Sequence, residues 1–402
     1  MKARRPPRSQ ATSRGRRWLS RLPTILAGAG LAFLAYQAAH EAIRGGVLTP
    51  GGASSEPAGS IASDDVCALT ELGLDAGESP PACWRPYSSD SPFNRLLPDD
   101  RPADPNSEAI VDRVVGFGPM QNLVAGYHDT PKDYSAPLYY SSRSDPIYRV
   151  QCTRYSGRCE IEGMELRIPA AARPAAGGDG HLTVIDEQAR WEYDFYDVSE
   201  KPDTGGTITV GWGGRTLVGG PGADGLGSGA TAAHFGRAAG TIRAQELEAG
   251  EIDHALFMVV RCTSGASAWP AAAGTTGTVC RETEDAPALG QHFYLDMSEA
   301  ALDQLKVAKW KRTILDAAAN YGMYVGDTGG GTWGIQIESD SSYTSFGEQP
   351  RWFEFARARK DAGFARYYDD EIDRTLYVAN LREVDWGSAL RVASPCHAMR
   401  TC

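Results

Sequence analysis

The sequence predicts a mainly β protein, a β-sandwich of the jelly-roll kind with a few appended helices. Strand-like runs dominate, because short segments rich in β-branched and aromatic residues recur along the chain. Turn residues separate these runs, with 45 Gly and 24 Pro in 402 residues. Helical spacing of apolar residues occurs in only three places, so a regular alternation of strands and helices is not expected.

A β-hairpin is the central element. Apolar and polar residues alternate through residues 181–186 and again through residues 190–198, and a short polar turn at 187–189 separates the two runs. Strand periodicity divides the second run into two faces, one with Trp191, Tyr193 and Phe195 and the other with Glu192, Asp194 and Tyr196. We expect the first face to contact the core.

The second face of this hairpin carries candidate catalytic residues. Glu192 and Asp194 lie two positions apart, so their carboxyls are expected roughly 6–7 Å from each other on one strand face. That separation suits the paired acids of glycoside hydrolases. An ordinary antiparallel sheet with a solvent-facing polar side gives the same alternation, so the pattern alone does not decide between the two.

The other elements follow in chain order. Further strands are expected at residues 165–169, 207–212, 216–218, 252–262, 292–297, 323–327 and 334–338. Helical spacing is found at residues 241–249, 298–320 and 352–364. In the second of these segments Ser298 can cap the first turn, and Gly322 follows the last turn.

The N-terminus predicts export. Residues 1–21 hold eight Lys/Arg and no acid, and residues 22–39 form an apolar run. A basic flank before such a run is a signal anchor or a secretory signal peptide, and the absence of a small-x-small triplet after it favours the anchor. Residues 40–60 have the composition of a flexible tether. Residues 61–402 then form one extracytoplasmic domain, either membrane-anchored or secreted after cleavage.

The cysteines agree with an exported chain. There are eight, all beyond the apolar run, and an even count predicts disulfides. Pairing of sequence neighbours gives Cys67–Cys83, Cys152–Cys159, Cys262–Cys280 and Cys396–Cys402. No spacing matches a zinc ribbon or a C-x-x-C redox pair, so these bridges are expected to close short loops.

Net charge restricts the partners. Residues 1–44 hold nine Lys/Arg and one acid, a charge of +8, so the remaining chain carries −11 − 8 = −19. Such an acidic domain is a poor ligand for nucleic acid or anionic headgroups. We expect a polysaccharide or cell-wall glycan as partner, no nucleic acid, and membrane contact only through the N-terminal apolar segment.

Three further residues are candidate catalytic groups. Asp327 ends a strand and precedes the nearly bare loop 328–331, which allows a ligand to approach the backbone. His181 begins the hairpin after a glycine-rich turn, where it either caps that turn or lines a cleft. His254 shares a strand face with apolar neighbours, the usual position of a core histidine. Gln336 and Glu338 share one face of the strand that follows the loop.

Several other chemistries lack their motifs. The glycine-rich segment 219–229 has no P-loop lysine, and its Ser228 does not lie in a G-x-S-x-G sequence. Asp179 and His181 form a D-x-H pair, but nothing nearby supplies a third metal ligand. We therefore expect no catalytic metal and no cofactor, although the Asp/Gly loops allow a structural calcium ion.

Two resemblances extend these expectations. Residues 192–196, EYDFY, resemble the start of the E-x-D-x-E strand of laminarinase-type glycoside hydrolases, whose fold is a concanavalin-like β-sandwich. That resemblance implies Glu192 as nucleophile and Asp194 as a helper, but Tyr196 occupies the position of the family's acid. Separately, SPFN, GEIDHAL and YGMYVGD resemble segments of exported bacterial proteins of unassigned function. The second similarity spans most of residues 85–340 and implies no activity.

These observations together predict an extracytoplasmic glycoside hydrolase. Glu192 is expected as nucleophile or base and Asp327 or Asp194 as proton donor. Aromatic rings that can stack on sugars are Trp212, Trp333 and Tyr196. Two alternatives stay open. One is a polysaccharide lyase, which would use His181, His254, Tyr193 and Arg190. The other is a non-catalytic wall-binding protein.

Overall fold

The computed structural model describes residue 74 and residues 77–154, 159–223, 229–272 and 277–395. The chain divides into two units, Met1–Ser60 and Ile61–Cys402, and every described residue belongs to the second. The predicted basic leader, apolar segment and tether therefore lie outside the described residues. No helix within the described ranges has the length and apolar character needed to cross a bilayer.

The described chain is mainly β, as predicted, and its largest sheet has five strands in the order β12-β9-β11-β10-β15. The strands are β9 (Leu256–Val260), β10 (His292–Leu295), β11 (Met323–Thr328), β12 (Trp333–Ile335) and β15 (Leu390–Val392). Strands β9 and β11 pair in parallel, and the other pairs are antiparallel. Strands β9 and β11 are almost fully buried, because other parts of the domain cover the sheet.

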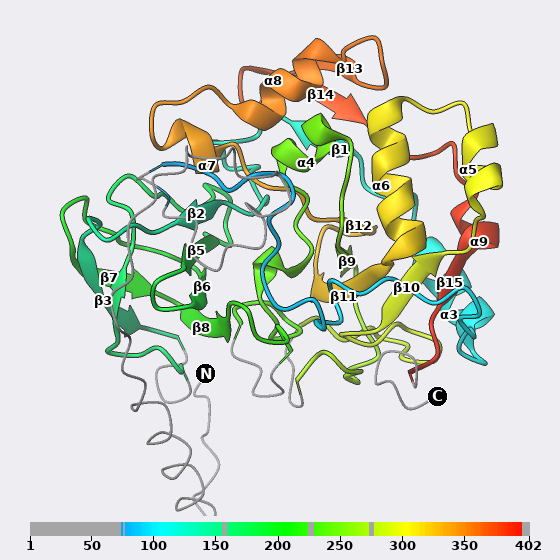
Figure 1. Ribbon diagram of the computed structural model, residues 1–402, viewed down its shortest axis with the longest axis horizontal. Helices are drawn as coiled ribbons and strands as arrows, with labels where there is room; N and C mark the ends of the chain where they lie inside the picture. The colour runs from blue at the N-terminus through cyan, green and yellow to red at the C-terminus, as the bar shows by residue number, and fades with distance from the viewer. Residues whose placement is uncertain (1–73, 75–76, 155–158, 224–228, 273–276, 396–402) are drawn as a thin grey trace, which may run out of the picture. The chain divides into compact units, whose positions relative to one another are not determined.

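Helices surround this sheet. They are α3 (Ser107–Val115), α4 (Ala244–Ala249), α5 (Glu299–Gln304), α6 (Lys309–Asn320), α7 (Ser341–Thr344), α8 (Arg351–Ala358), α9 (Trp386–Ala389) and the 3-10 turn η1 (Arg237–Ala239). Helix α6 lies along the sheet beside β10 (Figure 1) and buries Trp310, Ile314 and Leu315 in the same core as Phe293 and Val325. This core is the larger of the two main hydrophobic cores in the described residues.

Two smaller sheets share the second core. One has the order β2-β5-β6-β8 and contains β2 (Leu138–Tyr140), β5 (Leu182–Asp186), β6 (Trp191–Tyr196) and β8 (Trp212–Leu217). The other has the order β4-β3-β7 and contains β3 (Ile147–Cys152), β4 (Glu165–Arg167) and β7 (Gly206–Val210). Buried side chains from both sheets, such as Val150, Val184 and Phe195, pack together. The pairs β2–β5 and β3–β7 are parallel.

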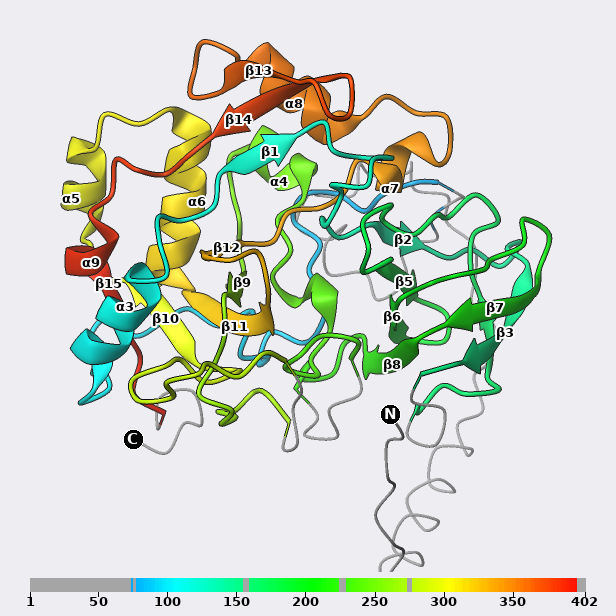
Figure 2. The same cartoon turned by 180° about the vertical axis from the view of Figure 1, so that it is seen from behind.

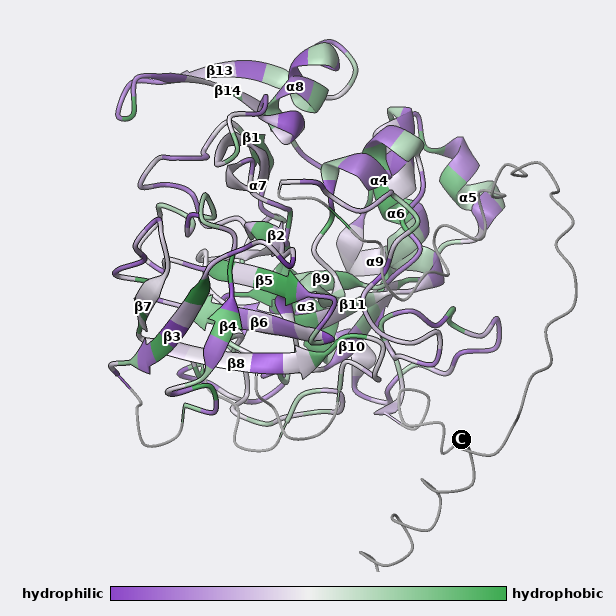
Figure 3. Cartoon of the chain, turned by 60° about the vertical axis from the view of Figure 1, so that its left-hand side comes forward, coloured by the Kyte–Doolittle hydropathy of each residue, from purple (hydrophilic) through white to green (hydrophobic). Residues whose placement is uncertain are grey.

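A third small sheet joins distant parts of the chain in the order β1-β14-β13. Its strands are β1 (Leu123–Ala125), β13 (Ala365–Asp369) and β14 (Arg374–Ala379), and α8 lies against it (Figure 2). Strand β13 forms an exposed edge of this sheet. Figure 3 shows that its residues are mostly hydrophilic, whereas those of the buried strand β5 are mostly hydrophobic.

The expected hairpin is confirmed. Strands β5 and β6 pair antiparallel with Val184 opposite Tyr193, and Tyr193 and Phe195 contact the core. Its turn has no glycine; Arg190 instead adopts a left-handed φ of 59°. The expected helix at 298–320 is divided in two, since α5 ends at Gln304 and α6 begins at Lys309. Strands β1, β2, β3, β13, β14 and β15 and helix α3 had not been predicted.

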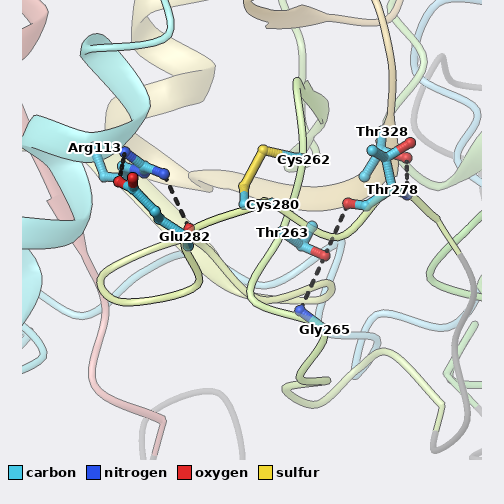
Figure 4. Close-up of a disulfide and its surroundings, with 8 residues drawn as sticks. All are labelled: Arg113, Cys262, Thr263, Gly265, Thr278, Cys280, Glu282 and Thr328. Atoms are coloured by element: carbon cyan, nitrogen blue, oxygen red, sulfur yellow. Dashed lines mark hydrogen bonds and ion pairs between the residues drawn. A yellow bond between two sulfur atoms is a disulfide. The ribbon is translucent and has the colours of Figure 1, made fainter.

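Two expected disulfides are confirmed. Cys152–Cys159 joins the end of β3 to the following loop, and Cys262–Cys280 closes the loop after β9 (Figure 4). Cys83 is also disulfide-bonded. Cys67, Cys396 and Cys402 lie outside the described residues, so their pairing stays a prediction.

Candidate functional site

A cavity of about 600 Å³ lies where the end of β11, the segment after β12, the turn η1 and the start of β5 meet. The loop that follows β1 forms another part of its wall. The cavity is rich in ionisable side chains. They are the acids Asp133, Asp179, Asp327, Glu338 and Asp340, the cations Lys132 and Arg237, and the imidazoles His128 and His181. Concave sites with converging polar groups are the usual place of ligand binding.

Arg237 connects the polar residues at one end of the cavity. Its guanidinium is only 3% exposed. The Nη2 atom lies 3.3 Å from Oδ2 of Asp327 and 3.1 Å from Nε2 of His181, and Nη1 lies 3.5 Å from Oε1 of Gln336. Turn η1 therefore brings together residues from β11, from the segment before β5 and from the segment after β12. A buried cation requires such partners.

Asp327 lies next to an irregularity in β11. The register with β9 shifts between Val325 and Asp327, and Gly326 fills the bulge, where a Cβ atom would lie 2.2 Å from the ring of Phe257. Bulges redirect neighbouring side chains and are common beside active sites. Oδ1 of Asp327 accepts a hydrogen bond from the Thr328 N–H at 2.8 Å. Burial raises the pKa of Asp327 above its ordinary value, and the Arg237 guanidinium offsets only part of this rise.

His181 is held as a neutral imidazole. Burial and the nearby Arg237 cation both lower its pKa well below the usual value of 6.5. Its ring lies beside that of Tyr196, with centroids 5.7 Å apart, and Asp179 is 3.9 Å away. Its ring nitrogens bond to the Arg237 guanidinium and to the backbone of Phe195, so the imidazole holds Arg237 at the cavity wall.

Glu338 is the second carboxyl of interest. It is 3% exposed, and burial raises its pKa from 4.5 to about 7, although the Tyr343 hydroxyl partly offsets this effect. That hydroxyl lies 2.6 Å from Oε2 of Glu338 and 2.9 Å from Oε1 of Gln245. A hydroxyl has one proton to donate. The hydroxyl donates to Glu338, and the Gln245 amide, whose nitrogen has no other partner among the described residues, can donate to the Tyr343 oxygen when its ends are exchanged.

The second oxygen of Glu338 has no hydrogen-bond partner among the described residues. It is buried, so an ionised carboxylate there would leave a full negative charge poorly compensated. This observation favours the neutral acid. Glu338 is thus a carboxylic acid that can give a proton near neutral pH.

The opposite end of the cavity is more tightly paired. Asp133 accepts hydrogen bonds from the hydroxyls of Ser135 and Ser339, and burial raises its pKa. Lys132 bonds to Asp369 at 2.7 Å and Glu371 at 2.6 Å, so its charge is compensated by the hairpin of β13 and β14. Asp133 and Lys132 are thus held in structural hydrogen bonds and ion pairs. Asp327 and Glu338 are the better candidates for catalytic residues.

His128 and Asp340 form a further pair at this end. Nδ1 of His128 lies 3.4 Å from Oδ2 of Asp340. Asp340 also accepts hydrogen bonds from the backbone N–H groups of Trp352 and Phe353 at the start of α8. The aspartate therefore caps that helix.

Of the sequence-predicted catalytic residues, Asp327 and His181 line the cavity, and Glu192 and Asp194 lie behind its wall. Glu192 is 0% exposed and Asp194 is 1% exposed, because turn η1 covers the polar face of β6. His254 lies elsewhere. It is buried, and its Nε2 lies 3.0 Å from Glu246, which also pairs with Arg243.

The predicted aromatic residues do not line the cavity. Trp333 is 1% exposed in the larger core and packs edge-on against Trp386 at 5.3 Å. Trp212 packs partly buried against the smaller core. The ring of Tyr196 lies beside that of His181 and does not line the cavity. The aromatic rings that do line the cavity are those of Tyr127, Tyr134 and Trp352.

Arg237, Glu338 and the residues from 128 to 135 had not been chosen from the sequence as site residues. The only available signal was the shared strand face of Gln336 and Glu338, both of which line the cavity. Arg237 lies in a segment of small residues without a motif. In the described parts of the chain no group of three or more His, Cys, Asp or Glu side chains is placed to hold a metal ion.

Comparisons of the chain with known protein families, with curated proteins and with solved structures found no match.

Proposed function

We propose that this protein is an extracytoplasmic glycoside hydrolase that acts on an uncharged polysaccharide through Asp327 and Glu338. The observation that carries the proposal is one cavity with two carboxyls in opposite environments. Asp327 is partly exposed and contacts the Arg237 cation, whereas Glu338 is buried and hydrogen-bonds to a phenol. Two acids whose surroundings separate their pKa values are the usual catalytic pair of these enzymes.

The roles follow from protonation. Glu338 would give its proton to the glycosidic oxygen as the bond from the anomeric carbon to that oxygen breaks. Asp327 would either attack the anomeric carbon or take a proton from the attacking water. Arg237 favours the ionised form of Asp327, and His181 and Gln336 hold Arg237 in place beside it. Glu192 and Asp194 receive no direct role, because they are buried behind Arg237.

Charge supports an uncharged glycan. The cavity has five carboxyls against two permanent cations, and both cations are already paired, Lys132 with Asp369 and Arg237 with Asp327. A polysaccharide or cell-wall glycan without acidic groups suits this lining better than a polyanion. The export that we propose agrees with the disulfides Cys152–Cys159 and Cys262–Cys280, which persist in oxidising compartments.

The concanavalin-like sandwich also belongs to this proposal. Its support is that sheets β2-β5-β6-β8 and β4-β3-β7 share one core, as the two sheets of a sandwich do. The parallel pairs β2–β5 and β3–β7 count against a jelly roll, which is built from antiparallel strands.

A polysaccharide lyase is the second candidate function. The observation that favours it is the contact of one arginine, Arg237, with His181 and Gln336, since lyases need a base and a group that neutralises the sugar carboxylate. The pairing of Arg237 with Asp327 weakens this candidate, because a sugar carboxylate would have to displace an aspartate.

The test is an assay of the full-length protein, purified in detergent, on a panel of plant and bacterial polysaccharides. We expect new reducing ends from an uncharged glycan, and loss of this activity in Asp327→Asn and Glu338→Gln. Glu348→Gln, an exposed acid ten positions after Glu338, is the matched control. An unsaturated product that absorbs in the ultraviolet would indicate the lyase. Binding without any turnover would indicate the wall-binding protein and reject the hydrolase.

A further inference from the structure

Glu192 and Asp194 form a second carboxyl pair that the proposed reaction does not use. Both belong to β6 and point to the same face of the strand, where η1 covers them. Two buried carboxylates on one strand face cannot both be ionised without a large cost in desolvation and in mutual repulsion. The titratable or charged groups that face them are Tyr87, from the segment before α3, and Arg237.

Hydrogen-bond donors surround both carboxyls. Oδ1 of Asp194 accepts from the Thr183 hydroxyl at 2.7 Å, and Oδ2 accepts from the Arg237 N–H at 3.3 Å. The two carboxyls are also hydrogen-bonded to each other. Both oxygens of Glu192 accept as well, Oε1 from the Ala238 N–H at 2.9 Å and Oε2 from the Tyr87 hydroxyl at 2.5 Å. The proton is placed on Glu192 because it has only neutral donors around it, whereas Asp194 lies beside the Arg237 cation. Burial and the neighbouring Asp194 raise the pKa of Glu192 well above 4.5, which agrees with this assignment.

The pair also fixes the backbone of η1. Oε1 of Glu192 accepts from the Ala238 N–H at 2.9 Å, and Asp194 accepts from the Arg237 N–H. Two successive N–H groups are thus bound to the two acids. The side chain that leaves this turn is the Arg237 guanidinium, which contacts Asp327 and His181 in the cavity.

We propose that Glu192 and Asp194 share one proton and act as positioning residues that hold Arg237 against Asp327 and His181. The shared proton stands on the burial of two acids on one face of β6 under η1, whereas the effect on turnover rests on the proposed hydrolase. Loss of the proton leaves two adjacent anions, which repel each other and weaken the bonds to η1. Arg237 then no longer holds Asp327 in place.

The first test is the infrared difference spectrum of the full-length wild-type protein against Glu192→Gln at pH 8. Glu338 is largely ionised at that pH, so a protonated carboxyl band that disappears in the variant belongs to Glu192. Glutamine keeps the shape and the donor of a protonated glutamate. An unchanged carboxyl band would overturn the shared proton, whatever the enzyme does.

The second test is the pH profile of turnover on the glycan that the wild type cleaves. We expect Glu192→Gln to stay active to higher pH than wild type, because an amide cannot lose the proton. Asp194→Asn should lower kcat/KM on the order of 10²-fold through displacement of Arg237. Thr183→Val removes one hydrogen-bond donor to Asp194 with little change of shape. It is the substitute variant if Asp194→Asn does not fold, and it should shift the alkaline limb of the pH profile.

The outcomes separate the two proposals. An inactive but folded Glu192→Gln at every pH would show that Glu192 itself reacts and would overturn the positioning role. An unshifted alkaline limb in both Glu192→Gln and Thr183→Val would overturn it as well. A wild type that cleaves no glycan would reject the hydrolase, but the infrared test would still decide whether the acids share a proton.

Discussion

Glu338→Gln is expected to make the protein more stable at alkaline pH while it abolishes turnover. The folded protein holds Glu338 with a pKa of about 7, against 4.5 for a free glutamate. A group whose folded pKa is raised contributes stability that is fully present below the unfolded pKa and is lost as the pH rises to the folded pKa. The loss for wild type therefore occurs between pH 4.5 and about pH 7.

The magnitude follows from the shift. About 7 minus 4.5 is about 2.5 units, and each unit corresponds to about 1.36 kcal/mol, so wild type loses roughly 3 kcal/mol of unfolding free energy across this interval. Glutamine cannot ionise, and its amide oxygen can accept from the Tyr343 hydroxyl as the acid does. The variant should equal wild type near pH 4.5 and exceed it by roughly 3 kcal/mol at pH 8.

Urea unfolding followed by tryptophan fluorescence at pH 4.5, 6 and 8 measures this difference. The matched control is Glu246→Gln, also a buried glutamate. Burial raises its pKa, but Arg243 and His254 outweigh this effect and hold it at about 2. Its stabilisation is present above pH 4.5 and is lost as pH falls toward 2, so the control should lose roughly 3 kcal/mol at pH 7. A Glu338→Gln curve parallel to wild type at all three pH values would refute a neutral Glu338.

Three further outcomes are expected. Asp327→Asn should lower kcat by about 10³-fold while the protein stays folded, measured by reducing-end kinetics and urea unfolding, since an amide can neither attack nor take a proton. Arg237→Lys should raise the apparent pKa of the acid limb of kcat/KM, because a lysine cannot contact Asp327 and His181 at once. Replacement of both Cys262 and Cys280 by Ala should cost about 2–4 kcal/mol of stability in the same unfolding assay.

The disulfide variant should also affect the site, for a reason visible in Figure 4. The loop closed by Cys262–Cys280 places the Thr278 N–H 2.9 Å from Oγ1 of Thr328. The N–H of Thr328 in turn donates to Asp327. We therefore expect a reduced kcat in addition to the reduced stability. Full activity in the folded double variant would show that this loop does not support Asp327.

Local patterns predicted the local elements. Alternation in residues 181–198 was enough for the hairpin of β5 and β6, because a strand with one apolar face has only one register that buries Tyr193 and Phe195. Ser298 accepts a hydrogen bond from the Ala301 N–H, as expected of an N-cap, and Gly322 adopts a left-handed φ of 78°. Such signals depend on a few adjacent residues.

The burial of the polar face of β6 could not be predicted in the same way. Alternation shows that Glu192 and Asp194 are opposite the core, but not what lies beyond them. Turn η1 comes some forty positions later and has no pattern, yet its backbone N–H groups cover both acids. A polar strand face covered by backbone looks the same in sequence as one that faces water.

The candidate site required contacts between segments that are distant in sequence. Asp327 and Glu338 are separated by eleven positions, and nothing local distinguishes an acid beside an arginine from an acid beside a tyrosine. That difference arises because η1 brings Arg237 to Asp327, while α7 brings Tyr343 to Glu338. Since catalysis by two carboxyls depends on their unequal protonation, the property that matters most belongs to the packing of these segments and not to either acid alone.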